Sequence, residues 1–255
     1  MNLTGKTVLV TGGAHRLGKA IVRALAARGA RLAIHYGSSA QAARQTVEEL
    51  AEEGSEAAAF SANLAQPAAI EPLLDAVSEH FGRLDMLVNS AASFRHQAFG
   101  EIDAEAWDEV LAVNLRAPFL LMQGAAKRMA AVSRPAEEPA VIVNIGDLAG
   151  VLAWQGMAHH ATSKGALLHL TRVAARELAP AVRVNAVVPG PILPPPGMSR
   201  DSAEWHGMSA GVPLARPGDP QRIGEAVVFL AENDYVTGHV LPVDGGEHLV
   251  GPVNH

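Results

Sequence analysis

Short apolar runs alternate with longer segments of helical periodicity along the whole chain. This alternation is typical of βαβ units, in which helices join parallel strands. The apolar runs predict strands at residues 7–11, 31–35, 56–61, 86–89, 141–145, 183–188 and 240–243. The periodic segments predict helices at residues 17–28, 39–53, 67–81, 104–129, 157–178 and 221–231. We therefore predict an α/β fold, with one seven-stranded, mainly parallel sheet that is doubly wound and carries helices on both faces.

Two stretches interrupt the alternation. Residues 132–139 are polar and predict a surface turn, whereas residues 189–220 are rich in proline and predict a long irregular segment. Irregular segments of that length are usually functional lids or linkers. Because a helix and a strand follow it, we favour a substrate lid at about 191–218 within a single domain over 1–255, rather than a domain boundary. Four of its larger side chains either line a pocket or form a hydrophobic seam: Met198, Trp205, His206 and Met208.

The composition narrows the possible partners. Of the 255 residues, 49% are hydrophobic and 18% are charged, which is enough apolar surface to cover both faces of a sheet. The formal net charge of −6 argues against binding to nucleic acid or to an anionic membrane surface. No apolar run reaches the roughly 18 residues of a membrane span, and the N-terminal segment lacks a signal-peptide pattern, so we expect a cytoplasmic protein. With no cysteine and scattered histidines, we expect no metal site.

One junction between a strand and a helix is rich in glycine. It reads Thr11-Gly12-Gly13-Ala14-His15-Arg16-Leu17-Gly18. Glycine lets a backbone turn tightly, approach a pyrophosphate and bring the helix close to the sheet. The helix N-terminus adds free amide donors and a partial positive charge. Because the junction lies in the first βα unit, we favour a Rossmann-type dinucleotide site over an ordinary glycine-rich turn.

The end of the second strand bears on the choice of dinucleotide. An acidic residue about 20 residues after the glycines usually binds the ribose 2′-hydroxyl of NAD. Here the chain reads Tyr36-Gly37-Ser38-Ser39, without an acid. Arg16, within the glycine-rich turn, is placed to reach a 2′-phosphate, although a solvated residue at the helix start is the alternative. We therefore expect NADP(H) as the cofactor.

These residues resemble the short-chain dehydrogenase/reductase family, and the similarity extends over nearly the whole chain. The family's turn is Thr-Gly-x-x-x-Gly-x-Gly, and this chain has Arg16 at the position of the middle glycine. That substitution is similar to the pteridine-reductase branch, which uses NADPH. The segment Asn89-Ser90-Ala91-Ala92-Ser93-Phe94 is similar to that branch's Asn-Asn-Ala-Ser-Ser-Phe. The resemblance implies that Phe94 stacks on a pterin, while a loop aromatic packed against the body is the alternative.

The resemblance also implies a set of binding residues. Further landmarks follow in the family's order: Asn63-Leu64 near the adenine, Asn114 supporting a water relay, and Pro189-Gly190 beside the nicotinamide. The residues expected to contact the cofactor are Thr11, Gly12, Arg16, Leu17, Gly18, Tyr36, Ser38, Ser39, Asn63, Leu64, Asn89, Ala91, Lys164, Pro189, Gly190 and Ile192. Those expected to contact the substrate are Ser93, Phe94 and Asp147. Family members are commonly tetramers, so we expect a homotetramer.

The expected catalytic residues depart from the family's pattern. A proton donor and a lysine four residues later project from one helix face, and here they are His160 and Lys164 rather than tyrosine and lysine. Thirteen residues before His160, Asp147 stands where the family usually has serine. Aspartate at this position is similar to pteridine reductases. A histidine is able to donate a proton near neutral pH, since its ordinary pKa is about 6.5. We hypothesise that Lys164 anchors the ribose, that His160 is the general acid, and that Asp147 orients it or is itself the proton source.

Two functions remain open from the residues alone. The first is an NADPH-dependent reductase that transfers hydride to a C=N or C=O bond, of a pteridine or dihydrofolate or of another cyclic substrate. The second is a protein that binds NADP(H) with little turnover, because the tyrosine is missing. We favour the reductase, because Asp147, Lys164, Asn114 and Phe94 all remain in place.

Overall fold

The computed structural model describes residues 1–135, 138–195 and 197–251. All the predicted strands are present, and each begins and ends within one residue of its predicted bounds. They are β1 (Thr7–Val10), β2 (Arg31–Tyr36), β3 (Ala57–Ser61), β4 (Met86–Asn89), β5 (Ala140–Ile145), β6 (Val182–Pro189) and β7 (Val240–Val243). They form one sheet in the order β3-β2-β1-β4-β5-β6-β7, and every neighbouring pair is parallel.

The predicted helices are also confirmed, with one refinement. They are α1 (Arg16–Ala26), α2 (Ala40–Glu52), α3 (Ile70–Phe81), α4 (Ala104–Leu111), α5 (Ala117–Ala131), α6 (Ala158–Glu177) and α8 (Pro220–Glu232). The single helix expected at 104–129 is α4 and α5 joined by a π-helical turn at Ala112–Arg116. Such turns are frequent at functional sites, and this one carries Asn114.

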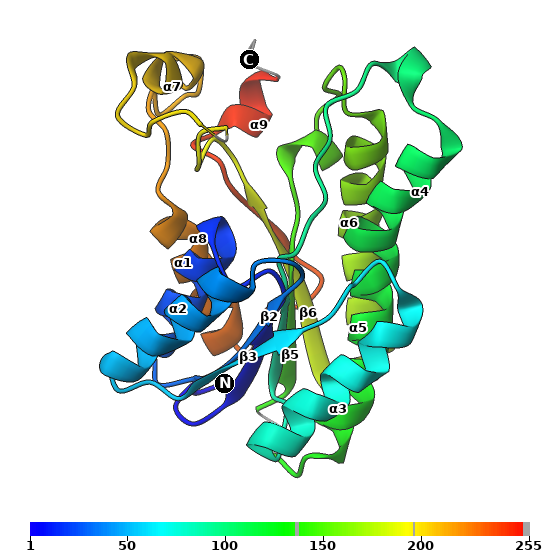
Figure 1. The fold of residues 1–255 in the computed structure, drawn as a ribbon, viewed down its shortest axis with the longest axis vertical. Coiled ribbons are helices and arrows are strands. Elements are labelled where there is room, and N and C mark those ends of the chain that lie inside the picture. The colour runs from blue at the N-terminus through cyan, green and yellow to red at the C-terminus, as the bar shows by residue number, and fades with distance from the viewer. Residues whose placement is uncertain (136–137, 196, 252–255) are drawn as a thin grey trace.

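The helices cover both faces of the sheet. On one face, α1, α2 and α8 pack in a core that includes Ile21, Leu50 and Val227; on the other lie α3, α5 and α6. Figure 1 shows these two layers on either side of the sheet, with α4 on the side of α5 and α6. The strands of the sheet are almost fully buried at β1, β4 and β5, which is why they read as continuous apolar runs.

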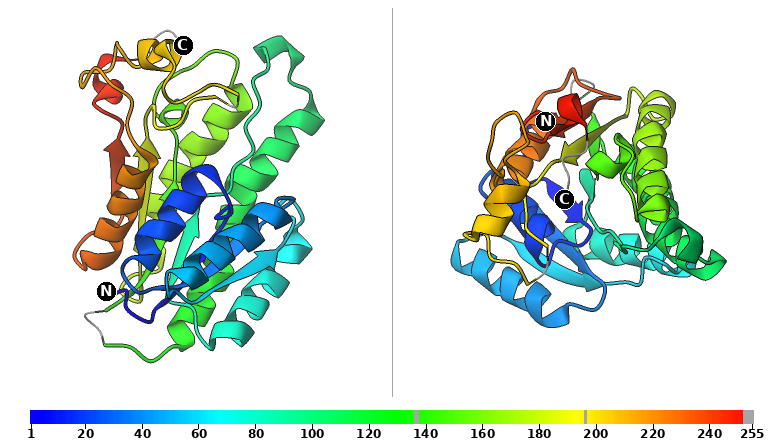
Figure 2. Two further views of the ribbon diagram at one scale, coloured as in Figure 1. Left: turned by 60° about the vertical axis from the view of Figure 1, so that its left-hand side comes forward. Right: turned by 90° about the horizontal axis from the view of Figure 1, so that it is seen from above.

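The topology locates the site. The chain order reverses between β1 and β4, because the first three strands extend the sheet in one direction and β4–β7 in the other. Ligands of doubly wound sheets bind at such a switch point, outside the carboxyl ends of the strands. Figures 1 and 2 show that the short helices α7 (Ala203–Met208) and α9 (Glu247–Val250) lie beyond this edge, far from the N-terminus.

The segment at 189–220 is less irregular than we expected. It contains α7, in which Ser202 caps the helix by accepting a hydrogen bond from the Trp205 amide. Trp205 is buried, whereas His206 is exposed. A six-residue helix that contains a glycine is too short to produce a periodic pattern. After the segment, α8 and β7 rejoin the same layers; residue 196, and residues 136–137 of the predicted surface turn, lie outside the described residues.

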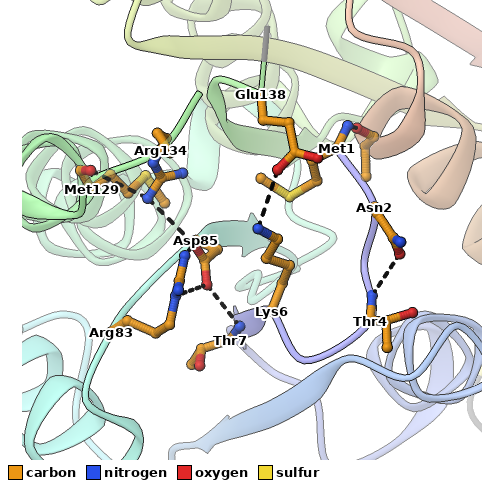
Figure 3. Close-up of polar contacts among 11 residues, drawn as sticks. Met1, Asn2, Thr4, Lys6, Thr7, Arg83, Asp85, Met129, Arg134 and Glu138 are labelled. Carbon is orange, nitrogen blue, oxygen red and sulfur yellow. Dashed lines mark hydrogen bonds and ion pairs between the residues drawn. The ribbon is translucent and has the colours of Figure 1, made fainter. Parts of the chain in front are cut away.

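A cluster of charged residues closes the opposite edge of the sheet (Figure 3). Asp85 precedes β4 and is fully buried, and its carboxylate accepts hydrogen bonds from the Thr7 amide and from the Arg83 guanidinium. The Arg134 guanidinium lies 3.3 Å from the same carboxylate. Asp85 therefore ties β1, β4 and the segment after α5 together.

Within the described ranges, no helix has the length and apolar character needed to cross a membrane.

Candidate active site

A cleft of about 770 Å³ opens at the carboxyl ends of β1, β2, β3 and β4. It brings together many of the residues that we expected to bind the cofactor: Gly12, Arg16, Leu17, Gly18, Ser38, Ser39, Asn63, Leu64 and Ala91. It is also lined by residues that we did not single out: His15, His35, Gly37, Ser61, Ala62, Ser90, Ala92 and Val113. The glycine-rich turn at residues 11–18, called the phosphate turn below, thus forms one continuous wall with the end of β2 and the start of the segment after β4.

Some expected cofactor contacts lie outside this lining. Tyr36 ends β2 without reaching the cleft wall. The Thr11 hydroxyl accepts hydrogen bonds from the amides of Ser90 and Ala91, at 2.9 and 3.1 Å, so it holds part of the wall in place. Asn89 is buried in the sheet and donates to Asn144 Oδ1.

The expected contacts after β6 are also placed beyond the lining of this cleft. Pro189 ends β6, and Gly190 packs so closely against Asp244 that a Cβ on it would lie 2.5 Å from the Asp244 Cα. This close approach explains the need for glycine there. Ile192 is buried in the hydrophobic core on the side of α1 and α8.

The glycines of the phosphate turn are required by close backbone approach. A Cβ on Gly18 would lie 2.1 Å from the Gly12 carbonyl oxygen, and one on Gly12 would lie 3.0 Å from the Ala91 Cα. Gly12 also has a φ of +66°. Arg16 has a φ of +51°, a left-handed conformation that glycine adopts more readily than other residues. The structure thus explains why glycine is usual at the position of Arg16.

The first turn of α1 is suited to bind an anion. The side chain of His15, the N-cap residue, makes no capping hydrogen bond. The amides of Arg16, Leu17 and Gly18 have no partner within the helix, because the first N–H groups of any α-helix lack one. All three residues line the cleft. Together with the helix dipole, these donors favour a phosphate group at this position.

The guanidinium of Arg16 has a partner outside the turn. It donates a hydrogen bond of 2.9 Å to the carbonyl oxygen of Pro194, in the segment that follows β6. Arg16 therefore connects the phosphate turn to the start of the predicted lid. Arg16 also lines the cleft, as do Ser38 and Ser39 between β2 and α2.

His35 is a functional candidate that we did not identify from the sequence. It is buried at the end of β2, and its Nδ1 accepts a hydrogen bond from the Gly12 amide. Its Nε2 lies 3.0 Å from the carbonyl oxygen of Ala62. A histidine within an otherwise apolar buried strand was the available signal, since buried polar side chains are hydrogen-bonded.

His160 and Asp147 come together as we predicted. His160 Nε2 lies 3.3 Å from Asp147 Oδ2. The His160 side chain is only 2% exposed, whereas that of Asp147 is 33% exposed. Asp147 therefore faces solvent at the end of β5, and His160 lies behind it in the first turn of α6.

Asp147 is held in its ionised form. Burial acts to raise its pKa, but the neighbouring His160, the hydrogen bond from the Ala149 amide and the charge of Lys164 outweigh burial, so the pKa of Asp147 lies below its usual value. At neutral pH the residue is thus a carboxylate.

Nδ1 of His160 faces the backbone of the segment after β4. It lies 3.3 Å from the carbonyl oxygen of Ser93 and 3.3 Å from the amide nitrogen of Asn114. The Asn114 amide already donates to the carbonyl of Ser93, at 2.9 Å, and to the hydroxyl of Ser163, at 3.1 Å. The carbonyl oxygen of Ser93 and the carboxylate of Asp147, near opposite nitrogens of the imidazole, are both hydrogen-bond acceptors.

Asn114 fixes the Ser93 backbone from the π-helical turn. Its Oδ1 accepts a 2.7 Å hydrogen bond from the Ser93 amide, while its Nδ2 donates to the Ser93 carbonyl. Phe94, the next residue, is 58% exposed, and its ring meets the His160 ring edge to face at 5.1 Å. An exposed aromatic face beside an acid–base pair is available to stack on a planar ligand.

Lys164 is buried one turn after His160 on α6. Its ammonium donates a 2.8 Å hydrogen bond to the carbonyl oxygen of Ile145, the last residue of β5. Burial lowers the pKa of Lys164, and the charge of Asp147 opposes this shift. The structure thus brings Asp147, His160 and Lys164 together between the end of β5 and the start of α6, and Asn114 of the π-helical turn lies against His160.

Comparisons with known proteins agree with this architecture. A family model described as enoyl-(acyl carrier protein) reductase matches residues 5–248. The 3-oxoacyl-[acyl-carrier-protein] reductase FabG of Vibrio cholerae is 34% identical over 253 residues, which cover 98% of this chain and 100% of that protein. The FolM alternative dihydrofolate reductase 1 of Brucella canis, solved with NADP, has a TM-score of 0.87 and 32% identity, covering 98% and 96% of the two chains. A short chain dehydrogenase of Burkholderia cenocepacia, also solved with NADP, has a TM-score of 0.87 and 33% identity, covering 96% and 99%.

Proposed function

Since the chain belongs to the short-chain dehydrogenase/reductase family, we propose that it is an NADPH-dependent reductase whose substrate is a pteridine, a dihydrofolate or a related planar ring. One observation carries the choice of substrate. The exposed ring of Phe94 lies directly beside the pair formed by His160 and Asp147. A flat heterocycle stacked on Phe94 would place a ring C=N bond next to that pair.

The cleft fits NADP(H). Its floor is formed by glycines whose side-chain positions are filled by backbone, so that a ligand is able to approach the turn closely. The residues lining it include no carboxylate, whereas Arg16, His15, Ser38 and Ser39 surround the end of β2. The relatives from Brucella and Burkholderia were both solved with NADP. We therefore propose that the α1 N-terminus binds the pyrophosphate and that Arg16, Ser38 and Ser39 bind the 2′-phosphate.

The side chains at the ends of β5 and α6 would supply the proton. Bound NADPH supplies a hydride to the carbon of a C=N or C=O bond. We propose that His160 and Asp147 supply this proton together, since His160 Nε2 and Asp147 Oδ2 lie 3.3 Å apart. The more exposed Asp147 would face the substrate and would pass to it a proton received from Nε2 of the buried His160. Lys164, through its remaining N–H donors, would anchor the nicotinamide ribose, and Asn114 holds the Ser93 backbone that faces His160.

A second candidate is reduction of a 3-oxoacyl thioester. The Vibrio relative that bears this name matches the whole chain at 34% identity. The family resemblance argues against this function, because it implies that Asp147 and His160 stand at the family's serine and tyrosine positions. The two functions therefore make opposite predictions about substrate preference.

We expect the purified protein to oxidise NADPH with dihydrobiopterin or dihydrofolate at a kcat/KM at least about tenfold above that with acetoacetyl-coenzyme A. The loss of NADPH absorbance measures each rate. Faster reaction with the thioester would instead support the 3-oxoacyl reductase. Binding of NADPH without oxidation by any of the three would support a cofactor-binding protein with little turnover.

Two phenylalanine variants test whether a preference for the pterin arises from stacking on Phe94. Phe94→Ala should raise KM for the pterin by about 2- to 10-fold, because a stacked aromatic pair contributes roughly 0.5–1.5 kcal/mol. Phe99→Ala is the matched control, since Phe99 is 85% exposed in the same segment and has no contact with His160. Equal effects of the two substitutions would contradict a stacking role for Phe94.

Arg16→Gly should change the preference for NADPH over NADH without introducing backbone strain. Glycine suits the φ of +51°, so the melting temperature should not fall through backbone strain. Loss of the guanidinium should lower the preference for NADPH over NADH by roughly 10- to 100-fold, because a hydrogen bond to a charged group contributes about 1.5–3 kcal/mol. The ratio of kcat/KM for the two cofactors measures this preference.

Lys19→Gln is the control for the removal of one charge from α1. Lys19 pairs with Glu49 and does not line the cleft. The Lys19→Gln substitution should leave the preference for NADPH over NADH unchanged. If Arg16→Gly also left this preference unchanged, Arg16 would serve only to hold Pro194.

The homotetramer expected from the family resemblance stays a prediction.

A further inference from the structure

Two consecutive amides of the phosphate turn are held by one residue of the neighbouring strand. The Gly12 amide donates a 3.2 Å hydrogen bond to Nδ1 of the His35 side chain. The Gly13 amide donates a 3.1 Å hydrogen bond to the main-chain carbonyl of the same residue. Both amides therefore point toward β2 and away from a ligand in the cleft.

The hydrogen-bond partners determine the protonation state of His35. Nδ1 faces an N–H group, so it must be the unprotonated nitrogen. Nε2 lies 3.0 Å from the Ala62 carbonyl, which only accepts, so Nε2 must carry the proton. Burial also lowers the pKa of His35, which favours the neutral imidazole that both contacts require.

The Gly12 peptide in turn supports the start of α1. The Gly12 carbonyl oxygen lies so close to Gly18 that a Cβ there would be at 2.1 Å. This oxygen belongs to the Gly12–Gly13 peptide, whose rotation would therefore push against the first turn of the helix. Glycine opposes such a rotation only weakly, because it has few conformational restrictions. The His35 main-chain carbonyl holds this peptide through the Gly13 amide, and the His35 imidazole holds the preceding Thr11–Gly12 peptide through the Gly12 amide. The two hydrogen bonds together restrict both backbone angles of Gly12.

We propose that His35 is a positioning residue for the cofactor: its neutral imidazole holds the Gly12 amide, and with it the backbone conformation of Gly12, so that the amides of Arg16, Leu17 and Gly18 remain free and aimed at the pyrophosphate. This role rests on the proposed NADP(H) site. His35 itself makes no hydrogen bond through Nδ1 or Nε2 to the cofactor, because each nitrogen already has a protein partner.

Three substitutions of His35 separate its two hydrogen bonds. His35→Asn keeps an acceptor near the position of Nδ1, whereas His35→Gln keeps a donor near the position of Nε2. His35→Leu keeps neither. Isothermal titration with NADPH should give a Kd within about twofold of the unsubstituted protein for His35→Asn. The Kd should be about 3- to 10-fold higher for His35→Gln and His35→Leu, which lose the bond to Gly12.

Asn185→Leu is the matched control for lost stability. Asn185 is also fully buried and also joins neighbouring segments, since its side chain accepts from the His239 amide and donates to the Val236 carbonyl. It lies on β6, outside the lining of the cleft. Its substitution should lower the melting temperature but leave the Kd for NADPH unchanged.

A second measurement tests the positioning without any cofactor. In protein labelled with ¹⁵N-histidine, the His35 imidazole should show the signature of the neutral form protonated at Nε2. The Gly12 amide should exchange slowly with solvent in the unsubstituted protein and in His35→Asn, and faster in His35→Gln and His35→Leu.

The outcomes distinguish this inference from the proposed function. Failure of the unsubstituted protein to bind NADPH would overturn the proposed site and, with it, the role of His35 toward the cofactor. Tight binding by the unsubstituted protein together with equal Kd values for His35→Asn, His35→Gln and His35→Leu would overturn the role of His35 alone. The same holds if Nδ1 proves to be the protonated nitrogen.

Discussion

His160→Gln and Asp147→Asn should each lower kcat for reduction by about 10²- to 10⁴-fold, and the double variant should lose little more than either single one. The expectation follows from the arrangement of the two side chains. His160 is almost fully buried, whereas the adjacent Asp147 side chain is 33% exposed, so in the proposed mechanism the proton leaves His160 through Asp147. Removal of either partner therefore removes the same proton source, so the two losses should not add.

The measurement is a double-mutant cycle on kcat, with the Kd for NADPH determined for each variant. That Kd should change little, since neither residue lines the dinucleotide cleft. His159→Gln is the matched control: His159 is the adjacent residue, fully buried, and its Nδ1 lies at the backbone amide of residue 160 rather than at Asp147. Losses that add fully in the double variant would show that the two residues act independently.

Asp85→Ala should lower the free energy of unfolding by about 3–5 kcal/mol, the usual effect of removing one partner from a buried ion pair. Asp85 is fully buried and interacts with Arg83, Arg134 and the Thr7 amide at the edge of the sheet opposite the cleft (Figure 3). Arg134 is only 11% exposed, so its charge would lose the carboxylate with which it forms an ion pair. For a protein of this length the melting temperature should fall by roughly 6–20 °C.

Asp75→Ala is the control for the removal of an ion-pair carboxylate. Asp75 pairs with Arg128 but is 59% exposed, and exposed pairs contribute only about 0–1 kcal/mol. Calorimetric or denaturant unfolding of both variants measures the difference. A loss of stability for Asp85→Ala as small as that for Asp75→Ala would show that the buried cluster relaxes without cost. NADPH binding by the folded fraction of Asp85→Ala should be unchanged, because the cluster is remote from the cleft.

Local patterns were sufficient to predict most of the fold. β4 and β7 match their predicted bounds, because both are short runs bounded by polar residues. The strand β2 was predicted one residue short of Tyr36, since strand ends depend on the pairing with β3. The π-helical turn at Asn114 gave no signal, because one extra residue in a turn leaves the helical periodicity almost unchanged.

The candidate site was also predictable in part from the sequence. The spacing of His160 and Lys164 on one helix is a local property, and it correctly placed both side chains at the end of β5. The contact between His160 and Asp147 joins two elements, yet the order of family landmarks was enough to expect it. What could not be predicted was their relative burial, which puts Asp147 in front of His160. Burial depends on every element packed around a side chain, including the Ser93 and Phe94 segment.

His35 illustrates the remaining limit most clearly. Its residue type and its place near the end of β2 are visible in the chain, but its partners Gly12 and Ala62 follow β1 and β3, the strands on either side of β2. Elements, their order along the chain and the glycine-rich turn follow from short-range pattern, because propensity and periodicity act within a few residues. The assignment of hydrogen-bond partners follows from the parallel packing of β3, β2 and β1, because only that packing brings three distant segments within reach of one imidazole ring.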